Sequence, residues 1–325
     1  MLCIVDKSTD PYRNLAAEEY LLTAFKEPIF RLWRNDSSVI VGRNQNAAAE
    51  INREFVESHN VAVVRRLTGG GAVFHDLGNV NYTFIDKRID GEDANAMFRR
   101  FTAPIVAALN KLGVAARLEG RNDLTIDGLK FSGNAMCIQG GRVLQHGTLL
   151  FSSKVEDISG ALLPRPEKYS GRSVQSVRSR VTNISSHLAS PMSVAEFIEF
   201  LRLNVAESCT PYSYSEKDEA AIERLADERY RTAEWNFGQS PAFGFRNCRK
   251  FPAGLVEVSM DITGGIMNDV TIQGDFFFKK PVSELCAMLE GRCYDKKEIT
   301  GILKPVTLDD YLCGISSAEL LELLF

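Results

Sequence analysis

"DLTIDGLKFSGNAMCI", residues 123–138, and the overlapping "CIQGGRVLQHGTLLF", residues 137–151, decide the fold class of this chain. Each holds a hairpin signal between alternating segments: Asp127-Gly128 in the first and Gly140-Gly141 in the second. Such pairs favour two-residue turns because they adopt positive φ at little cost. The stretch therefore predicts a mainly antiparallel sheet in the middle of the chain.

Helical and strand patterns lie on both sides of these hairpins. Apolar residues at helical spacing predict helices over 11–25, 93–113, 193–208 and 215–235. Runs rich in β-branched residues predict strands over 29–33, 38–42 and 61–66. Pro104 is expected to kink or divide its helix, and Ser193 with Glu196 has the spacing of a capping box. Helices before and after an antiparallel sheet indicate the α+β class.

The 325 residues are long enough for about two domains. "WNFGQSPAFGF", residues 235–245, breaks the helical pattern with glycine and proline. We place the boundary there, which gives domains over 1–245 and 246–325. The second domain contains a hairpin pattern over 255–272 followed by helical patterns, so it is expected to be a small α+β unit.

The net charge of −4 argues against a nucleic-acid binder, which usually carries a basic excess. No apolar run is long enough to span a membrane. The seven cysteines are odd in number and include no C-x-x-C pair, which disfavours a disulfide framework and a zinc site. Reduced thiols and an N-terminus without a leader pattern predict a cytoplasmic protein.

"RRLTGGGAVFHD", residues 65–76, carries three consecutive glycines after two arginines. It lacks the G-K-[ST] of a phosphate-binding loop and the helix that follows a dinucleotide turn. A tight turn between strands is one interpretation. The other is that bare backbone N–H groups approach an anion or an acyl chain, with Arg65 and Arg66 nearby to bind phosphate or carboxylate.

Three further segments carry candidate ligand-binding groups. Lys130 follows the Asp127-Gly128 turn and either points to solvent or reaches into a cleft toward an anion. Asn122 and Asp123 lie just upstream, and Asp123 is a candidate magnesium ligand because Mg²⁺ is commonly held by one or two carboxylates plus phosphate oxygens. "SVRSRVTNI", residues 176–184, is either a solvated loop or an anion-binding loop.

The order of five blocks resembles the lipoate–protein ligase A family. They are "RRLTGGGAVFHDLGNVNYTFI" (65–85), "GRNDLTIDGLKFSGNA" (120–135), "LQHGTLLF" (144–151), "SVRSRVTNI" and "EWNFGQSPAF" (234–243). The resemblance runs from the "NLAAEEYLL" helix to about residue 245. It implies the catalytic fold shared by biotin and lipoate ligases, with a mixed sheet, and an accessory C-terminal domain.

The resemblance also implies roles for individual residues. Lys130 matches the essential lysine of the family, and Asp123 matches a position near the metal. The remaining positions that it places at the lipoate or adenylate are Arg66, Thr68, Gly70, Gly71, Val73, Phe74, His75, Asn122, Ser132, His146, Ser176, Arg178, Arg180 and Thr182. Leu129 and Thr68 depart from the family pattern, where a basic residue and a serine are usual.

The implied activity is activation of free lipoate by ATP and Mg²⁺ to lipoyl-AMP, followed by transfer to a lysine of an acceptor protein. The implied acceptors are lipoyl domains of 2-oxoacid dehydrogenase E2 subunits or the glycine-cleavage H protein. One alternative is an octanoyl or lipoyl transferase that uses no ATP and acts through a cysteine, for which Cys137 is the candidate. The other is a non-catalytic lipoate-binding protein, which the joint presence of Arg66, Asp123 and Lys130 disfavours.

Overall fold

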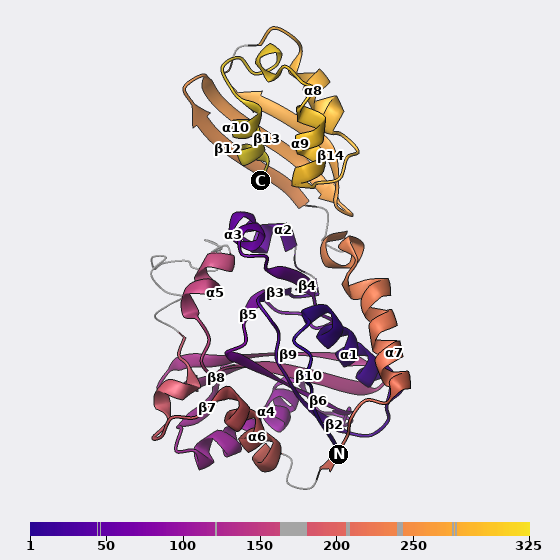
Figure 1. The fold of residues 1–325 in the computed structure, drawn as a ribbon, viewed down its shortest axis with the longest axis vertical. Coiled ribbons are helices and arrows are strands. Elements are labelled where there is room, and N and C mark those ends of the chain that lie inside the picture. Colours follow the sequence, from indigo (N-terminus) through magenta and orange to yellow (C-terminus); the bar gives the residue numbers. More distant parts are fainter. Residues whose placement is uncertain are drawn as a thin grey trace. The chain divides into compact units, whose positions relative to one another are not determined.

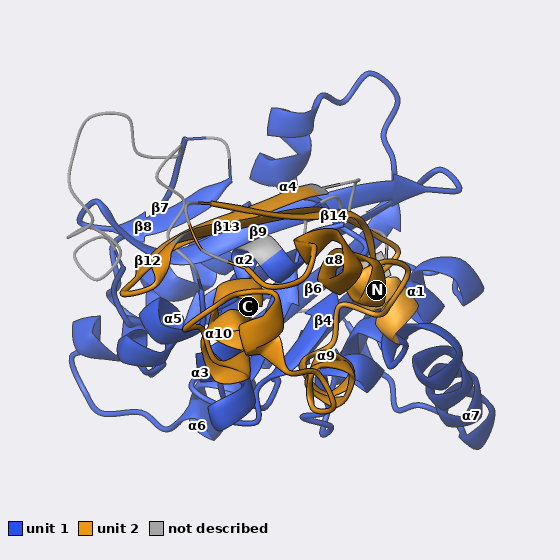
Figure 2. Cartoon of the chain, turned by 90° about the horizontal axis from the view of Figure 1, so that it is seen from above, with its two compact units in different colours: residues 1–232 blue, residues 233–325 orange. Residues whose placement is uncertain are grey.

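The computed structural model describes residues 1–43, 45, 47–120, 122–162, 181–205, 209–238, 243–274, 276 and 278–325. The chain forms two compact units, residues 1–232 and 233–325 (Figure 2). This division comes earlier than the expected boundary at 245/246, which falls inside strand β12 (Phe243–Phe251). The assignment of catalytic and accessory domains to 1–245 and 246–325 stays a prediction.

An eight-stranded sheet forms the centre of the first unit. Its order is β11 (Thr210–Pro211), β1 (Leu2–Val5), β2 (Ile29–Trp33), β6 (Asn79–Lys87), β10 (Arg142–Leu150), β9 (Leu129–Gln139), β8 (Asp123–Ile126) and β7 (Ala116–Glu119). Strand β1 is parallel to both of its neighbours, and all other pairs are antiparallel. The predicted α+β class with a mixed, largely antiparallel sheet is confirmed.

The two predicted hairpins form strands β8, β9 and β10 of this sheet. Asp127 and Gly128 have φ of 51° and 77°, and Gly140 and Gly141 have φ of 58° and 75°. Positive φ at both central residues is the requirement of a type I′ turn, whose twist matches that of the paired strands. The turns fix the register in which Ile126 faces Leu129, and so they position Lys130 at the start of β9.

A second, three-stranded sheet of the first unit has the order β4 (Ala62–Arg65), β3 (Ser38–Val41), β5 (Val73–His75). Strand β3 is parallel to β4 and antiparallel to β5. Because β4 and β5 lie on opposite sides of β3, the segment 66–72 that joins them must cross the end of β3. We call this segment the glycine loop.

Helices cover both faces of the large sheet (Figure 1). Phe30 and Leu32 of β2 pack with α4 (Ala94–Lys111) and α6 (Val194–Val205), whereas Ile29 packs with Leu21 of α1 (Pro11–Ala24) on the other face. This alternation follows the two-residue period of a strand. The other α-helices among the described residues of the unit are α2 (Ala47–Glu50), α3 (Arg53–Ser58), α5 (Val155–Ala161) and α7 (Glu216–Leu225).

Helix α4 is continuous through Pro104, so the expected division does not occur. Proline removes one helical hydrogen bond, and burial of Phe101 and Ile105 on either side of it favours the uninterrupted helix. The predicted capping box is present: the Ser193 N–H donates to Glu196 Oε2 at 2.7 Å, and the Glu196 N–H donates to Ser193 Oγ at 3.2 Å.

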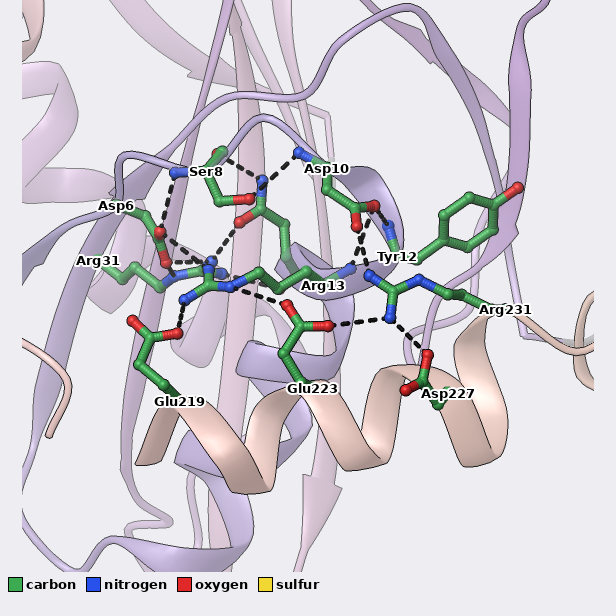
Figure 3. A network of polar contacts seen from close by, with 11 residues as sticks. Asp6, Ser8, Asp10, Tyr12, Arg13, Arg31, Glu219, Glu223, Asp227 and Arg231 are labelled. Atoms are coloured by element: carbon green, nitrogen blue, oxygen red, sulfur yellow. Dashed lines mark hydrogen bonds and ion pairs between the residues drawn. The ribbon is translucent and has the colours of Figure 1, made fainter. Parts of the chain in front are cut away.

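Ion pairs attach α7 and the turn after it to the start of α1 (Figure 3). Arg13 pairs with Glu219 and Glu223 of α7, and Arg231 pairs with Asp10 at 2.6 Å. The same Arg13 also pairs with Asp6 at 3.2 Å. The N-terminal segment is therefore held in place by charged residues from about two hundred positions later in the chain.

The second unit consists of β12, β13 (Gly254–Thr263) and β14 (Ile266–Gly274) in one antiparallel sheet, with α8 (Val282–Leu289), α9 (Lys296–Leu303) and α10 (Ser317–Leu324). Its core is its own, with Val256, Met267, Leu285 and Ile299 fully or nearly fully buried. The predicted hairpin is present, and helices follow it as expected. Among the described residues of the whole chain, no helix is long and apolar enough to cross a membrane.

Candidate active site

A cavity of about 160 Å³ lies in the first unit, on the face of the large sheet that α1 covers. Residues of α1, of both sheets and of the glycine loop line it. The predicted site residues among them are Arg66, Gly70, Gly71, Val73, His75, Asn122, Lys130 and His146. None of the described lining residues is acidic, while Arg66 and Lys130 are cationic. The cavity therefore favours an anionic ligand.

Arg66 is buried and holds the glycine loop from within. Its Nη2 donates to the carbonyls of Gly69 (2.7 Å) and Gly71 (2.8 Å), its Nη1 to the carbonyl of Ile40 (2.9 Å), and its Nε to Thr68 Oγ1 (2.9 Å). Burial lowers the pKa of Arg66 to about 10, which still leaves the side chain cationic at neutral pH. Arg66 thus combines a fixed positive charge with a structural role in the loop.

One close backbone contact of the loop involves a glycine outside the glycine triplet. A Cβ placed on Gly42 would come within 2.0 Å of the Gly70 carbonyl oxygen. Gly70 itself has a φ of +92°, which disfavours any other residue. A Cβ on Gly69, by contrast, would meet no atom within 4 Å. The loop therefore lies against the end of β3 only because position 42 lacks a side chain.

A chain of hydrogen bonds continues from Arg66 beneath the cavity. Thr68 Oγ1 lies 2.8 Å from Nε2 of His146, and Nδ1 of His146 lies 3.0 Å from the Glu18 carboxylate. The Thr83 hydroxyl donates to the same carboxylate at 2.6 Å. Burial alone would raise the pKa of Glu18, but His146, Arg31 and Thr83 hold it below its usual range.

Lys130 lies in a more open part of the cavity. Its side chain is 42% exposed, and its Nζ is 2.9 Å from Oδ1 of Asp123, whose side chain is 41% exposed. A Cβ on Gly133 would come within 3.2 Å of that Nζ, so the glycine leaves the space that the lysine occupies. Neighbouring Asn122 is fixed by its own bond, since its Nδ2 donates to the carbonyl of Asn134 at 2.7 Å.

The other predicted residues have different surroundings. Phe74 and Ser132 are buried and do not line the cavity. Thr182 lies beside the site, because its N–H donates to the carbonyl of Lys130 at 2.9 Å and its hydroxyl lies 2.8 Å from Nε2 of His187. Ser176, Arg178 and Arg180 lie outside the described residues.

The lining residues that were not among the predicted site residues are Leu15, Trp33, Ile40, Ala72, Asn81, Gly133, Asn134, Ala135, Gly147 and Thr148. Glu18, behind His146, was also missed as a site residue. Its signal was present in the sequence, because it stands between Leu15 and Leu22 on the apolar side of α1, where a glutamate is unusual.

Cys137 does not line the cavity. It lies seven residues from Lys130 on β9, roughly 23 Å along an extended strand. Burial, followed by the nearby Glu18 and Glu19, raises the pKa of Cys137 to about 12. Its thiol is therefore protonated at neutral pH, which disfavours a role as nucleophile.

Two family models match the chain. The "Lipoyl protein ligase A/B catalytic domain" covers residues 10–205, and the "Bacterial lipoate protein ligase C-terminus" covers residues 240–324. The lipoate-protein ligase LplJ of Bacillus subtilis is 39% identical over 97% of both chains, and lipoate–protein ligase 1 of Staphylococcus aureus is 38% identical over 97% of both chains. These matches extend over both compact units.

Solved structures agree with the family models. A lipoate-protein ligase A bound with ATP is 29% identical with a TM-score of 0.64, covering 73% of this chain and 98% of that chain. The bi-partite lipoate protein ligase of Thermoplasma acidophilum, studied with its E2 lipoyl domain, is 30% identical with a TM-score of 0.66, covering 74% of this chain and 97% of that chain. With the lysine, the glycine loop and the cavity in the matched region, the chain belongs to the lipoyl protein ligase A/B family.

Proposed function

We propose that this chain is an ATP-dependent lipoate–protein ligase, which converts free lipoate to lipoyl-AMP and then transfers the lipoyl group to a lysine of an acceptor protein. The observation that carries the proposal is that two cations, Arg66 and Lys130, line the cavity, while none of its described lining residues is acidic. A protein that only binds a neutral ligand would not need these two positive charges in its cavity. The family membership and the full-length relatives named as lipoate-protein ligases support the same activity.

Activation of lipoate brings two anions together, because the carboxylate attacks the α-phosphate of ATP and releases pyrophosphate. The charge of the Lys130 ammonium, on the cavity side of β9, offsets this repulsion and stabilises the negative charge of the transition state. Arg66 adds positive charge from a fixed, buried position. The glycine loop presents backbone to the ligand, since Gly70 and Gly71 line the cavity without side chains.

In the second step the amine of the acceptor lysine attacks the acyl carbon, and AMP leaves. An amide bond forms and the mixed anhydride bond breaks. Lys130 remains positioned to hold the oxygens of the anhydride during this attack. No acyl-enzyme is needed, which agrees with the raised pKa of Cys137.

The residues around Lys130 are suited to a magnesium ion that is held mainly by the nucleotide. Asp123 is an accessible carboxylate beside Lys130, and among the described residues no group of three or more acidic, histidine or cysteine side chains is arranged so that it could hold a metal ion. Asp123 would hold Mg²⁺ together with phosphate oxygens of ATP, and the ion would supply positive charge there.

The acceptors we propose are lipoyl domains of 2-oxoacid dehydrogenase E2 subunits and the glycine-cleavage H protein. The test uses the full chain with lipoate, ATP, Mg²⁺ and a purified lipoyl domain, and intact-mass spectrometry of that domain. We expect the mass of one lipoyl group to be added and AMP to be formed in equal amount. An acceptor in which arginine replaces the target lysine is the control. Modification from an acyl carrier without ATP would contradict the proposal and support the transferase alternative.

A further inference from the structure

His75 is a buried residue of the cavity wall whose two ring nitrogens have different surroundings. The residue is 3% exposed. Its Nδ1 lies 3.1 Å from Nδ2 of Asn35 and 3.5 Å from Nδ2 of Asn81. Its Nε2 is buried, and none of the residues that the structure describes lies within hydrogen-bonding distance of it.

The orientation of the Asn35 amide is fixed by a chain of bonds that starts at a charged group. Arg31 has only donors, and its Nη2 donates to Oδ1 of Asn14 at 2.9 Å. The Asn14 Nδ2 therefore points the other way and donates to Oδ1 of Asn35 at 3.0 Å, and to the carbonyls of Ser8 and Arg34 at 2.9 Å each. Asp6 anchors Arg31 at 2.8 Å (Figure 3).

This chain determines the tautomer of His75. Since Oδ1 of Asn35 accepts from Asn14, the Nδ2 of Asn35 is the donor to His75, and Nδ1 of His75 must be the acceptor. A neutral imidazole that accepts at Nδ1 carries its hydrogen on Nε2. Burial, with His146 and Arg66 nearby, lowers the pKa of His75 to about 3, so the ring is neutral at physiological pH. The result is a buried N–H donor that belongs to a residue of the cavity wall and has no partner among the described residues.

The position of this donor relative to Lys130 follows from the sheet order. The His75 ring lies edge-on to Trp33 of β2, with ring centroids 6.1 Å apart, and close to Asn81 of β6. Lys130 belongs to β9, and the order is β2-β6-β10-β9. Two to three strand spacings, or about 10 to 14 Å, therefore separate His75 from Lys130.

An extended eight-carbon acyl chain is roughly 9 Å long, from seven bonds of about 1.5 Å each. With its carboxyl carbon near Lys130, such a chain ends near His75. Other donors at that end are engaged: the indole N–H of Trp33 donates to Thr83 Oγ1 at 2.8 Å, and both nitrogens of His146 have partners. The distal end of the lipoyl chain carries a five-membered ring with two sulfurs, which are weak acceptors.

We propose that His75 determines acyl specificity: its Nε2–H donates a hydrogen bond to a sulfur of the lipoyl ring and so favours lipoate over octanoate. Octanoate has the same chain length but no acceptor at its distal end, so it leaves this buried donor unpaired. A site built around a donor discriminates against an analogue that lacks the acceptor. The inference rests on the proposed function, because lipoate is its ligand.

The test compares kcat/KM for ATP–pyrophosphate exchange with lipoate and with octanoate, in the unaltered chain, His75→Phe and His75→Gln. The two acids share their carboxyl end, so the lipoate-to-octanoate ratio isolates the distal contact. We expect His75→Phe to lower this ratio about 3- to 10-fold, the value of a neutral hydrogen bond. His75→Gln, which can place an N–H at the same point, should restore most of the ratio. His59→Phe, at an exposed histidine outside the cavity, is the matched control and should leave it unchanged.

A spectroscopic readout covers the case in which these variants do not fold. Nitrogen-15 spectra of the His75 ring in the unaltered chain should show the hydrogen on Nε2 from pH 5 to 8, and its resonance should move more with lipoate than with octanoate. Equal losses with both acids, an unchanged ratio in His75→Phe, or a hydrogen on Nδ1 would overturn the inference. Absence of exchange with either acid in the unaltered chain would instead overturn the proposed function.

Discussion

Arg66 and Lys130 are the two cations that line the cavity, and they differ in almost every other respect. Arg66 is 5% exposed, and the protein itself supplies acceptors for its Nε, Nη1 and Nη2. The Lys130 side chain is 42% exposed and pairs with one carboxylate, Asp123, that is equally accessible. An exposed pair of this kind contributes little to stability.

Because of this difference, the two side chains can have different roles. The donors of Arg66 are committed to holding the glycine loop against β3, so its removal changes the shape of the site. The ammonium of Lys130 can leave Asp123 for a ligand oxygen at small cost. Water can solvate both charges when the exposed ion pair opens, and the flexible side chain of the lysine lets its ammonium move. Substitutions at Arg66 should therefore affect folding and activity together, and substitutions at Lys130 should affect activity alone.

The largest effect is expected for Lys130→Ala. We expect the single-turnover rate of lipoyl-AMP formation to fall by at least about 10³-fold, because a charge that stabilises the transition state is lost. The melting temperature should change little, because the exposed ion pair with Asp123 contributes at most about 1 kcal/mol to stability. A variant that forms lipoyl-AMP at a near-normal rate would remove Lys130 from the mechanism.

Arg66→Met tests the structural role of Arg66. The substitution keeps the apolar stem but leaves the carbonyls of Ile40, Gly69 and Gly71 without their donor. We expect the free energy of unfolding of the first unit to fall by about 2–4 kcal/mol, measured by denaturant unfolding. Loss of activity with unchanged stability would contradict the structural role of Arg66.

Gly42→Ala tests whether the position of the loop depends on the backbone contact with Gly70. The added Cβ meets the Gly70 carbonyl oxygen at 2.0 Å, so the loop must move. We expect a loss of about 1–3 kcal/mol in stability together with weaker lipoate binding by calorimetry. Gly69→Ala is the matched control, since its Cβ meets no atom within 4 Å. Equal effects of the two substitutions would contradict this account of the loop.

The smallest effect concerns pH. The pKa of Glu18 is held below its usual range in the folded state, so its carboxylate stabilises the fold above about pH 4.5 and this contribution is lost as the pH falls. Glu18→Gln should cost about 1–2 kcal/mol at pH 7. The difference in unfolding free energy between the two proteins should shrink below pH 4.5. A difference that grows with falling pH would show that the sign is wrong.

Features set by local chemistry could be predicted from the sequence. The Asp127-Gly128 and Gly140-Gly141 turns, the helix caps and the α+β class follow from residues that are neighbours in the chain. The glycine loop and Lys130 were found as candidates for the same reason, and the family resemblance joined them into one site.

Features that depend on distant pairing could not be predicted. Strand β1 pairs with β2 and with β11, which lies about two hundred residues later. The four residues of β1 are too few to indicate these partners by their own pattern. Gly42 is needed because of a loop that folds back on it. The tautomer that we infer for His75 depends on the orientation of Asn35, which is set by Asn14 and Arg31 on other elements.

Lipoate-dependent exchange of pyrophosphate into ATP, with the full chain and no acceptor protein, isolates the activation of the carboxylate from the transfer step. We expect exchange that requires both lipoate and magnesium and that disappears in Lys130→Ala while the variant stays folded. Exchange that persists in Lys130→Ala, or its absence in the folded, unaltered chain, would contradict the claim that the open cation of this cavity activates a free carboxylate.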